Sequence, residues 1–212
     1  MPIPNLLSIL NHLTPYFSDS MLIIVSGFAG SGKSTLAESI GKAFNLPVVH
    51  ASHLLQQLKQ KEMAELDTEN TKAGSGWWEG KEAQEYMKQR QKDSSMDKAL
   101  DKELLAIAEK GNVVLDSWTM PWLCKNGIKV WLNAKAETRA KRVSERDNLK
   151  YQDVLKKIKE RDKKTAGINK KIYGFEMGKD YAPFDIVIIT DKLQQEDVRK
   201  IAIQKIKDLE VK

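Results

Sequence analysis

The sequence holds one cysteine, three histidines and no long uninterrupted apolar run among its 212 residues. A single thiol, Cys124, excludes an intrachain disulfide framework and a multi-cysteine zinc site, and we expect it to be a small packed side chain. The histidines His12, His50 and His53 lack metal-ligand spacing and are expected to be structural. No apolar run approaches the roughly 20 residues that cross a bilayer, and the N-terminus lacks the basic start of a signal peptide. We therefore expect no membrane association and a cytoplasmic location.

The charge is unbalanced toward the basic side. The chain has 35 Lys and Arg against 29 Asp and Glu, which gives a net charge of +6. Much of the excess lies in one stretch that contains Lys156, Lys157, Lys159, Lys163, Lys164, Lys170 and Lys171. No RNA-binding signature accompanies this stretch. The pattern favours a solvated basic helix over nucleic-acid binding, and it is compatible with phosphate binding by a few of the lysines.

Short apolar segments alternate with amphipathic segments along the chain. Strands are expected over residues 21–26, 47–50, 112–116, 129–133 and 184–190. Helices are expected over 33–44, from a cap at Ser52, around 100–108 up to Gly111, over 137–146 and 151–163, and around 198–209. This alternation predicts an α/β fold with a five-stranded parallel sheet covered by helices on both faces. Residues 1–20 are expected to form a leader helix on a single domain that spans 21–212.

A glycine-rich motif follows the first strand and opens the first helix of the domain. It fits G-x-x-x-x-G-K-[ST] and consists of Gly27, Phe28, Ala29, Gly30, Ser31, Gly32, Lys33, Ser34 and Thr35. Free amides of such a loop point at phosphate oxygens, and we would expect Lys33 to contact the β- and γ-phosphates of ATP and the Ser34 hydroxyl to ligate Mg²⁺. The alternative is a glycine turn with an incidental lysine. The complete spacing between a strand and a helix favours a P-loop that binds ATP.

One carboxylate and a row of arginines are the next candidates. Asp116 ends the third strand, where a carboxylate orients Mg²⁺ or its waters, although it could also be a strand-end cap. Arg139, Arg142 and Arg146 share one helical face, and Arg161 lies one helix later. In a kinase such arginines are catalytic because they stabilise charge on the transferring phosphoryl group. A solvated face with ion pairs to Glu137, Glu145 and Asp147 is the alternative.

Together these motifs resemble the archaeal type of cytidylate kinase, among the nucleoside monophosphate kinases of the P-loop NTPase fold. The resemblance rests on Gly27–Thr35, on Asp97-Lys-Ala-Leu-Asp101 followed by Glu109-Lys-Gly-Asn-Val-Val-Leu115, and on Arg139-Ala-Lys-Arg142, Glu160-Arg-Asp162 and Ile172-Tyr-Gly174. It implies a mobile acceptor-binding region, here about 52–101, and an arginine-bearing lid, here about 148–171, which would exclude water. It also implies ATP and Mg²⁺, with CMP or dCMP as the phosphate acceptor.

The chain departs from this family on the acceptor side. An arginine is expected after the second strand, where Gln56 and Gln57 stand, and the acidic-Gly-Arg pattern after the third strand is replaced by Asp116-Ser-Trp118. Before Ile172 an arginine is again expected, and residues 168–171 offer none. Lys59, Lys61 or Lys81 could supply the charge. These departures keep open a P-loop kinase with a different small-molecule acceptor.

The acceptor region contains side chains suited to a planar ring. Our candidates for substrate binding are Ser52, Trp77, Trp78, Asp101 and Trp118. For Trp77 and Trp78, packing in the core is an equal alternative to substrate binding. For Asp101 the equal alternative is a position on a solvated helix face. Trp122 and Trp131 are expected in the core. A third reading, motivated by the charge and the tryptophans, is a nucleotide-dependent RNA-associated ATPase or binding module. The kinase reading predicts a monomer.

Overall fold

The computed structural model describes residues 21–64, 90 and 93–210, and within 59–64 it describes the backbone alone. The leader over 1–20 and the candidates Trp77, Trp78 and Lys81 lie outside the described residues, as do the side chains of Lys59 and Lys61. Predictions for these residues stay predictions.

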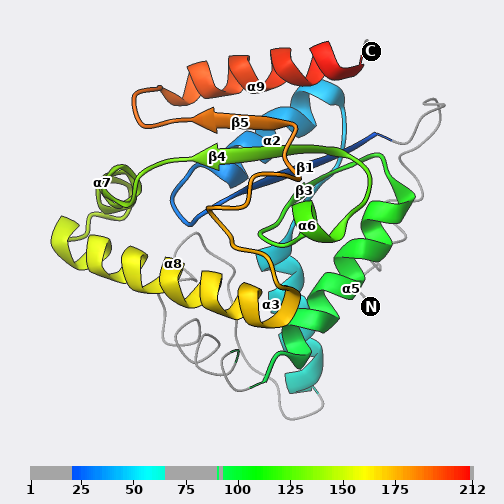
Figure 1. Ribbon diagram of the computed structural model, residues 1–212, viewed down its shortest axis with the longest axis horizontal. Helices are drawn as coiled ribbons and strands as arrows, with labels where there is room; N and C mark the ends of the chain where they lie inside the picture. The colour runs from blue at the N-terminus through cyan, green and yellow to red at the C-terminus, as the bar shows by residue number, and fades with distance from the viewer. Residues whose placement is uncertain (1–20, 65–89, 91–92, 211–212) are drawn as a thin grey trace.

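Five parallel strands form a single sheet (Figure 1). They are β1 Leu22–Gly27, β2 Val48–His50, β3 Val113–Asp116, β4 Ile128–Asn133 and β5 Ile186–Ile189, in the order β2-β3-β1-β4-β5. The prediction of five parallel strands is confirmed. Since β1 pairs with β3 and β4 on its two sides, its carboxyl end lies beside the ends of both, with Val25 opposite Asp116 and Gly27 opposite Leu132. The phosphate motif that follows β1 is therefore at the centre of the sheet edge.

Seven described helices connect or flank the strands. They are α2 Lys33–Phe44, α3 Ala51–Ala64, α5 Ser95–Lys110, α6 Met120–Leu123, α7 Ala136–Asp147, α8 Tyr151–Tyr173 and α9 Gln195–Glu210. Gly111 ends α5 with a positive φ of 66°, as predicted. The short helix α6 begins beside Pro121 and was not predicted.

Two helix boundaries differ from the prediction. Helix α3 begins at Ala51, so Ser52 lies inside its first turn rather than at its cap. Helix α8 continues ten residues beyond the expected end at Lys163 and stops at Tyr173, before Gly174, which has a φ of 82°. Thr165, Ile168 and Asn169 continue the buried face of this helix. Gly167 lies within the helix, which tolerates a single glycine, and the helix ends before Gly174.

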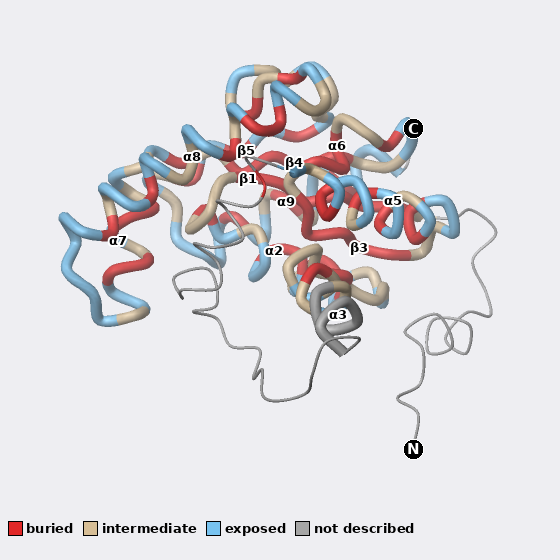
Figure 2. The backbone as a smooth tube through the Cα atoms, turned by 90° about the horizontal axis from the view of Figure 1, so that it is seen from below, coloured by how far each residue is buried: buried red, intermediate tan, exposed pale blue. Residues whose placement is uncertain are grey.

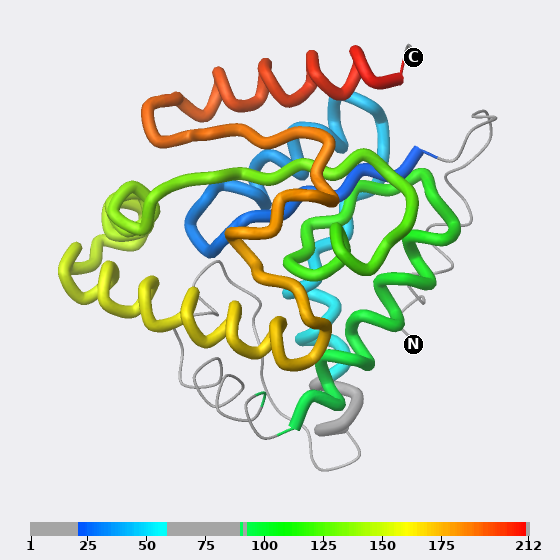
Figure 3. Tube along the Cα trace, in the orientation of Figure 1, coloured from blue at the N-terminus to red at the C-terminus, as the bar shows by residue number. Residues whose placement is uncertain are grey.

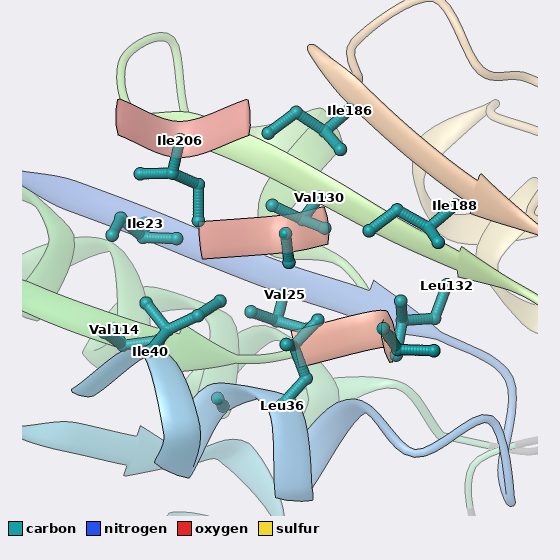
Figure 4. Packing of buried hydrophobic residues seen from close by; sticks show 13 residues of the cluster. Ile23, Val25, Leu36, Ile40, Val114, Val130, Leu132, Ile186, Ile188 and Ile206 are labelled. Carbon is teal, nitrogen blue, oxygen red and sulfur yellow. The ribbon is translucent and has the colours of Figure 1, made fainter. Parts of the chain in front are cut away.

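The sheet is covered on both faces, as the alternation predicted. Figure 4 shows Ile23 and Val25 of β1 packed with Leu36 and Ile40 of α2, and Ile206 of α9 adds to the same cluster. The intervening residues of β1 point to the other face, where they meet α5 and β3 in a cluster that contains Leu22, Ile24, Leu104, Ile107 and Leu115. Figure 2 shows β1 buried along its length. This central strand gives the phosphate motif a rigid base.

An aromatic cluster packs on β4 around Trp131. Trp131 is fully buried, which confirms its core prediction, and Trp122 is partly buried and packs against this cluster, stacked on Phe175 with ring centroids 4.1 Å apart. Cys124 is also buried, as expected. No helix within the described part of the chain has the length and apolarity needed to cross a membrane.

Candidate active site

The motif Gly27–Thr35 forms a tight loop between β1 and α2. Gly30 and Gly32 have φ angles of 77° and 93°, which only glycine adopts without strain. A Cβ on Gly30 would also lie 2.9 Å from a methyl carbon of Val143. At the N-terminus of α2 the cap residue Gly32 carries no side-chain cap hydrogen bond, and the first turn has no acidic residue. This turn therefore has no side-chain cap among the described residues, which is the arrangement that phosphate binding at a helix N-terminus requires.

Ser34 and Asp116 meet beside this loop. The Ser34 hydroxyl donates a hydrogen bond of 2.6 Å to Asp116 Oδ2 across the junction of α2 and β3. The other oxygen, Oδ1, is buried and has no hydrogen-bond partner among the described residues. Burial acts to raise the pKa of Asp116, but the Lys33 ammonium and the hydrogen bonds from His50 and Ser34 outweigh it, so this pKa is lowered. An ionised oxygen without a partner beside a hydroxyl fits the hard-oxygen ligands of Mg²⁺.

Lys33 occupies a crowded cationic environment. Burial lowers its pKa, the Asp116 carboxylate opposes that effect, and the nearby guanidinium groups of Arg161, Arg139 and Arg146 lower it further. The Lys33 ammonium also lies 5.9 Å from the centroid of the Trp118 ring. Several cations held around one half-buried lysine favour binding of a polyanion.

Two of the predicted arginines hold the loop itself. Arg139 is 3% exposed and donates hydrogen bonds to the carbonyl of Ala29 and to the Asp162 carboxylate on α8. Arg142 donates to the Thr190 carbonyl at 2.6 Å and contacts the Ser31 carbonyl at 3.5 Å. The solvated-face alternative is therefore wrong for Arg139. These contacts fix the backbone of the phosphate loop against α8 and the end of β5.

The remaining two arginines have different surroundings. Arg146 is an exposed residue that pairs with Asp147, as the ion-pair alternative expected. Arg161, on α8, lies with its guanidinium 5.1 Å from the centroid of the Trp118 ring. Trp118 thus contacts Lys33 and Arg161 together. The predicted catalytic role of the four arginines stays a prediction.

A cavity extends from the phosphate loop into the predicted acceptor region. Its wall brings together the predicted residues Lys33, Ser34, Ser52, Asp101, Asp116 and Trp118 with Ala51, Leu55, Arg90, Asp97, Leu100, Ser117 and Thr119. Asp101 is 5% exposed, so the solvated helix face is wrong for this residue. Thr119 donates a hydrogen bond of 2.6 Å to Asp101 Oδ1, and the Tyr173 hydroxyl donates to Oδ2. Burial raises the pKa of Asp101, and these two hydrogen bonds oppose the shift.

The Tyr173 contact joins the two halves of the site. Figure 3 traces α8 along its length, and Tyr173, its last residue, bonds to Asp101 of α5. Helix α8 therefore extends from Asp162, which bonds to Arg139 beside the phosphate loop, to Tyr173, which bonds to Asp101 in the cavity wall.

Sequence reasoning missed several residues of this cavity. Arg90 is buried and its Nε donates a 2.7 Å hydrogen bond to Asp97. The signal for Asp97 was present, because it lies four residues before Asp101 and shares its helix face. Arg90 lies in a polar stretch without apolar periodicity, so the sequence contained no signal that this residue would be buried. His50, which we expected to be structural, lies outside the cavity wall but its ring contacts Asp116.

Comparison with known proteins gives a consistent result. A model of the cytidylate kinase-like family matches residues 22–192. The cytidylate kinase of Sulfurisphaera tokodaii is 33% identical over 184 residues, which cover 85% of this chain and 92% of that protein. The cytidylate kinase of Methanocaldococcus jannaschii is 32% identical over 194 residues, which cover 89% and 99%.

Solved structures share the fold at lower identity. An uncharacterised protein from Eubacterium ventriosum superimposes with a TM-score of 0.57 at 18% identity and covers 88% of this chain and 98% of its own. Shikimate kinase from Acinetobacter baumannii gives 0.55 at 16% identity, with 92% and 98% covered. The P-loop NTPase fold predicted from the sequence is confirmed.

Proposed function

The chain belongs to the cytidylate kinase-like family, and on this premise we propose that it is a nucleoside monophosphate kinase that transfers the γ-phosphoryl group of ATP to CMP or dCMP. One observation supports this proposal above the others. A single cavity has Lys33, Ser34 and Asp116 at the phosphate loop and Ser52, Asp101 and Trp118 in the acceptor region. Donor and acceptor phosphates can therefore meet without either leaving the protein.

The donor end binds and orients ATP. The amides of the loop and of the first turn of α2 would hold its phosphates, and Lys33 would contact the β- and γ-phosphates. Ser34 and Asp116 would hold Mg²⁺, which when bound neutralises phosphate charge. Arg139 and Arg142 keep the loop in shape through the carbonyls of Ala29 and Ser31. Phosphoryl transfer depends mainly on such positioning and charge stabilisation.

Helix α8 is the element that would exclude water. It carries Arg161 to the Trp118 wall of the cavity and Tyr173 to Asp101. We propose that segment 148–171 closes over bound nucleotides as a lid, and that Arg161 then stabilises charge on the transferring group while Arg146 assists from α7. Exclusion of water prevents hydrolysis of ATP in place of transfer.

The acceptor end has a chemistry suited to a base with an amino group and to a phosphate. Asp101 is a buried hydrogen-bond acceptor, and the exocyclic amino group of cytosine is a donor. Arg90 supplies a guanidinium in the cavity, where the family resemblance led us to expect arginines from other positions. Trp118 offers an aromatic face for the base. The proposal therefore places the base near Asp101 and Trp118, with Arg90 serving the acceptor phosphate.

An acceptor panel tests the proposal. ADP release would be measured by a coupled assay with CMP, dCMP, UMP, AMP, shikimate and gluconate at fixed Mg-ATP. We expect CMP or dCMP to give the highest kcat/KM, with UMP weaker because it lacks the amino group. If all the nucleotides give only background rates while a non-nucleotide acceptor turns over, the protein is instead a P-loop kinase with a different small-molecule acceptor. The absence of the expected arginines on the acceptor side is the reason for keeping this alternative.

A further inference from the structure

A chain of hydrogen bonds runs from the surface to the Asp116 carboxylate. The Oδ2 atom of Asp116 accepts from two donors, Ser34 Oγ at 2.6 Å and His50 Nδ1 at 2.9 Å. The other nitrogen of the His50 ring, Nε2, lies 2.8 Å from Glu38 Oε1. Glu38 and Ser34 are one turn apart on α2, and His50 ends β2, the strand next to β3. Helix α2 therefore contacts Asp116 twice, once directly and once through His50.

The two carboxylates fix the imidazole ring. Each ring nitrogen faces a carboxylate oxygen, Nδ1 that of Asp116 and Nε2 that of Glu38, so contacts on both sides hold the ring in one orientation. His50 therefore contacts Asp116 through one ring nitrogen and Glu38 through the other.

The consequence for Asp116 is a defined orientation. Two donors on Oδ2 fix the rotation of the carboxylate, and its Oδ1 remains a buried oxygen without a hydrogen-bond partner among the described residues. A buried oxygen left in this state is costly unless something binds it. Hydrogen bonds that orient a metal-binding carboxylate commonly strengthen the metal site.

We propose that His50, held by Glu38, is a positioning residue that keeps Asp116 Oδ1 available to the Mg²⁺ of a bound Mg-nucleotide or to its water shell. This inference rests on the proposed function, because it assumes that a Mg-nucleotide binds at the phosphate loop. It assigns to His50 and Glu38 a role in metal affinity that neither the strand end nor the helix surface would otherwise require.

The test measures metal binding rather than turnover. Mn²⁺ replaces Mg²⁺ as the probe, and its affinity for the protein complexed with a non-hydrolysable ATP analogue is measured by electron paramagnetic resonance. The variants are His50→Ala, His50→Asn and Glu38→Ala. His53→Ala is the matched control, because its ring centroid lies 5.0 Å from that of His50 and no hydrogen bond joins it to Asp116 among the described residues. Affinity for the analogue in EDTA and the thermal midpoint in EDTA are measured in parallel.

We expect His50→Ala to weaken Mn²⁺ binding by about 10- to 100-fold. Affinity for the analogue in EDTA should stay within a factor of two of the wild type, on the order of experimental error. His50→Asn should restore most of the loss, because its amide nitrogen lies close to the position of Nδ1 and donates to Asp116. Glu38→Ala should weaken Mn²⁺ binding by a smaller factor. The Glu38 side chain is 53% exposed, so Glu38→Ala tests the hydrogen-bond chain from Glu38 through His50 to Asp116 even if His50→Ala does not fold.

Several results would overturn the inference. They are unchanged Mn²⁺ affinity in both His50→Ala and Glu38→Ala, an equal loss in His53→Ala, or a failure of Asn to improve on Ala. Mn²⁺ binding that needs no nucleotide and disappears in both relay variants would make His50 a ligand and would contradict its positioning role. If the wild-type protein binds no Mn-nucleotide at all, the proposed function itself fails. If the wild type binds it and His50→Ala and Glu38→Ala bind it equally well, only the positioning role fails.

Discussion

We expect the buried ion pair between Arg139 and Asp162 to contribute both to the stability of the protein and to its affinity for ATP. Arg139 is 3% exposed and joins three parts of the molecule, through the Ala29 carbonyl of the phosphate loop, the Ala134 carbonyl and the Asp162 carboxylate of α8. Burial raises the pKa of Asp162, and its hydrogen bond with Arg139 opposes that shift. Arg139→Met removes the guanidinium and leaves the carboxylate in place.

Breaking such a pair by removing one partner costs about 3–5 kcal/mol. We expect the lower end, about 3 kcal/mol, because the Asp162 side chain is 18% exposed and can recover some hydration. For a domain of this size that corresponds to a decrease of roughly 6–12 °C in the unfolding midpoint. Replacing both residues, as Arg139→Met with Asp162→Leu, should recover most of the lost stability, since no buried charge is then unpaired. It should not recover affinity for ATP, because the Ala29 carbonyl still lacks its donor.

Urea denaturation followed by circular dichroism measures the stability cycle, and titration with Mg-ATP measures the affinity. A single variant within about 1 kcal/mol of the wild type would refute the reasoning on stability. A double variant with wild-type ATP affinity would refute the role of Arg139 in holding the loop.

Three further predictions concern individual side chains. Lys33→Ala should lower phosphoryl transfer by at least about 100-fold with the circular dichroism spectrum unchanged; near wild-type turnover would contradict the mechanism. Arg90→Gln should raise the KM for CMP roughly tenfold or more and leave the KM for ATP unchanged in steady-state assays, whereas an equal rise in both constants would count against an acceptor role. Burial raises the pKa of Cys124 to about 11, so its alkylation by iodoacetamide at pH 8 should be slow until urea unfolds the chain. Rapid alkylation of the folded protein would show that the thiol is not packed as described.

The position of the phosphate-loop motif between a strand and a helix could be predicted from the sequence because its determinants are local. Gly27–Thr35 is contiguous, and the apolar run before it and the periodic helix after it fix its context. Asp116 needed only a strand end. Helix α8 was predicted too short because the apolar spacing weakens after Ile158, and only tertiary packing reveals that Thr165 and Asn169 are buried.

The predicted acceptor region and the surroundings of Asp116 depend on contacts between distant segments. Asp101 bonds to Tyr173, 72 residues away, and His50 bonds to Asp116, 66 residues away. No local pattern encodes these pairs, because they follow from the strand order β2-β3-β1-β4-β5 and from the path of α8 across the site. Arg90 is the clearest case, since its polar surroundings in the sequence hide a buried guanidinium.

The most direct test of the proposed activity follows the terminal phosphate of ATP. With γ-labelled ATP, Mg²⁺ and CMP, we predict that the label appears in CDP and that this transfer greatly exceeds release of labelled inorganic phosphate. We predict that Lys33→Ala abolishes both the transfer to CDP and the release of inorganic phosphate. Label that appears only as inorganic phosphate, or that remains on ATP in the presence of either CMP or dCMP, would contradict the account.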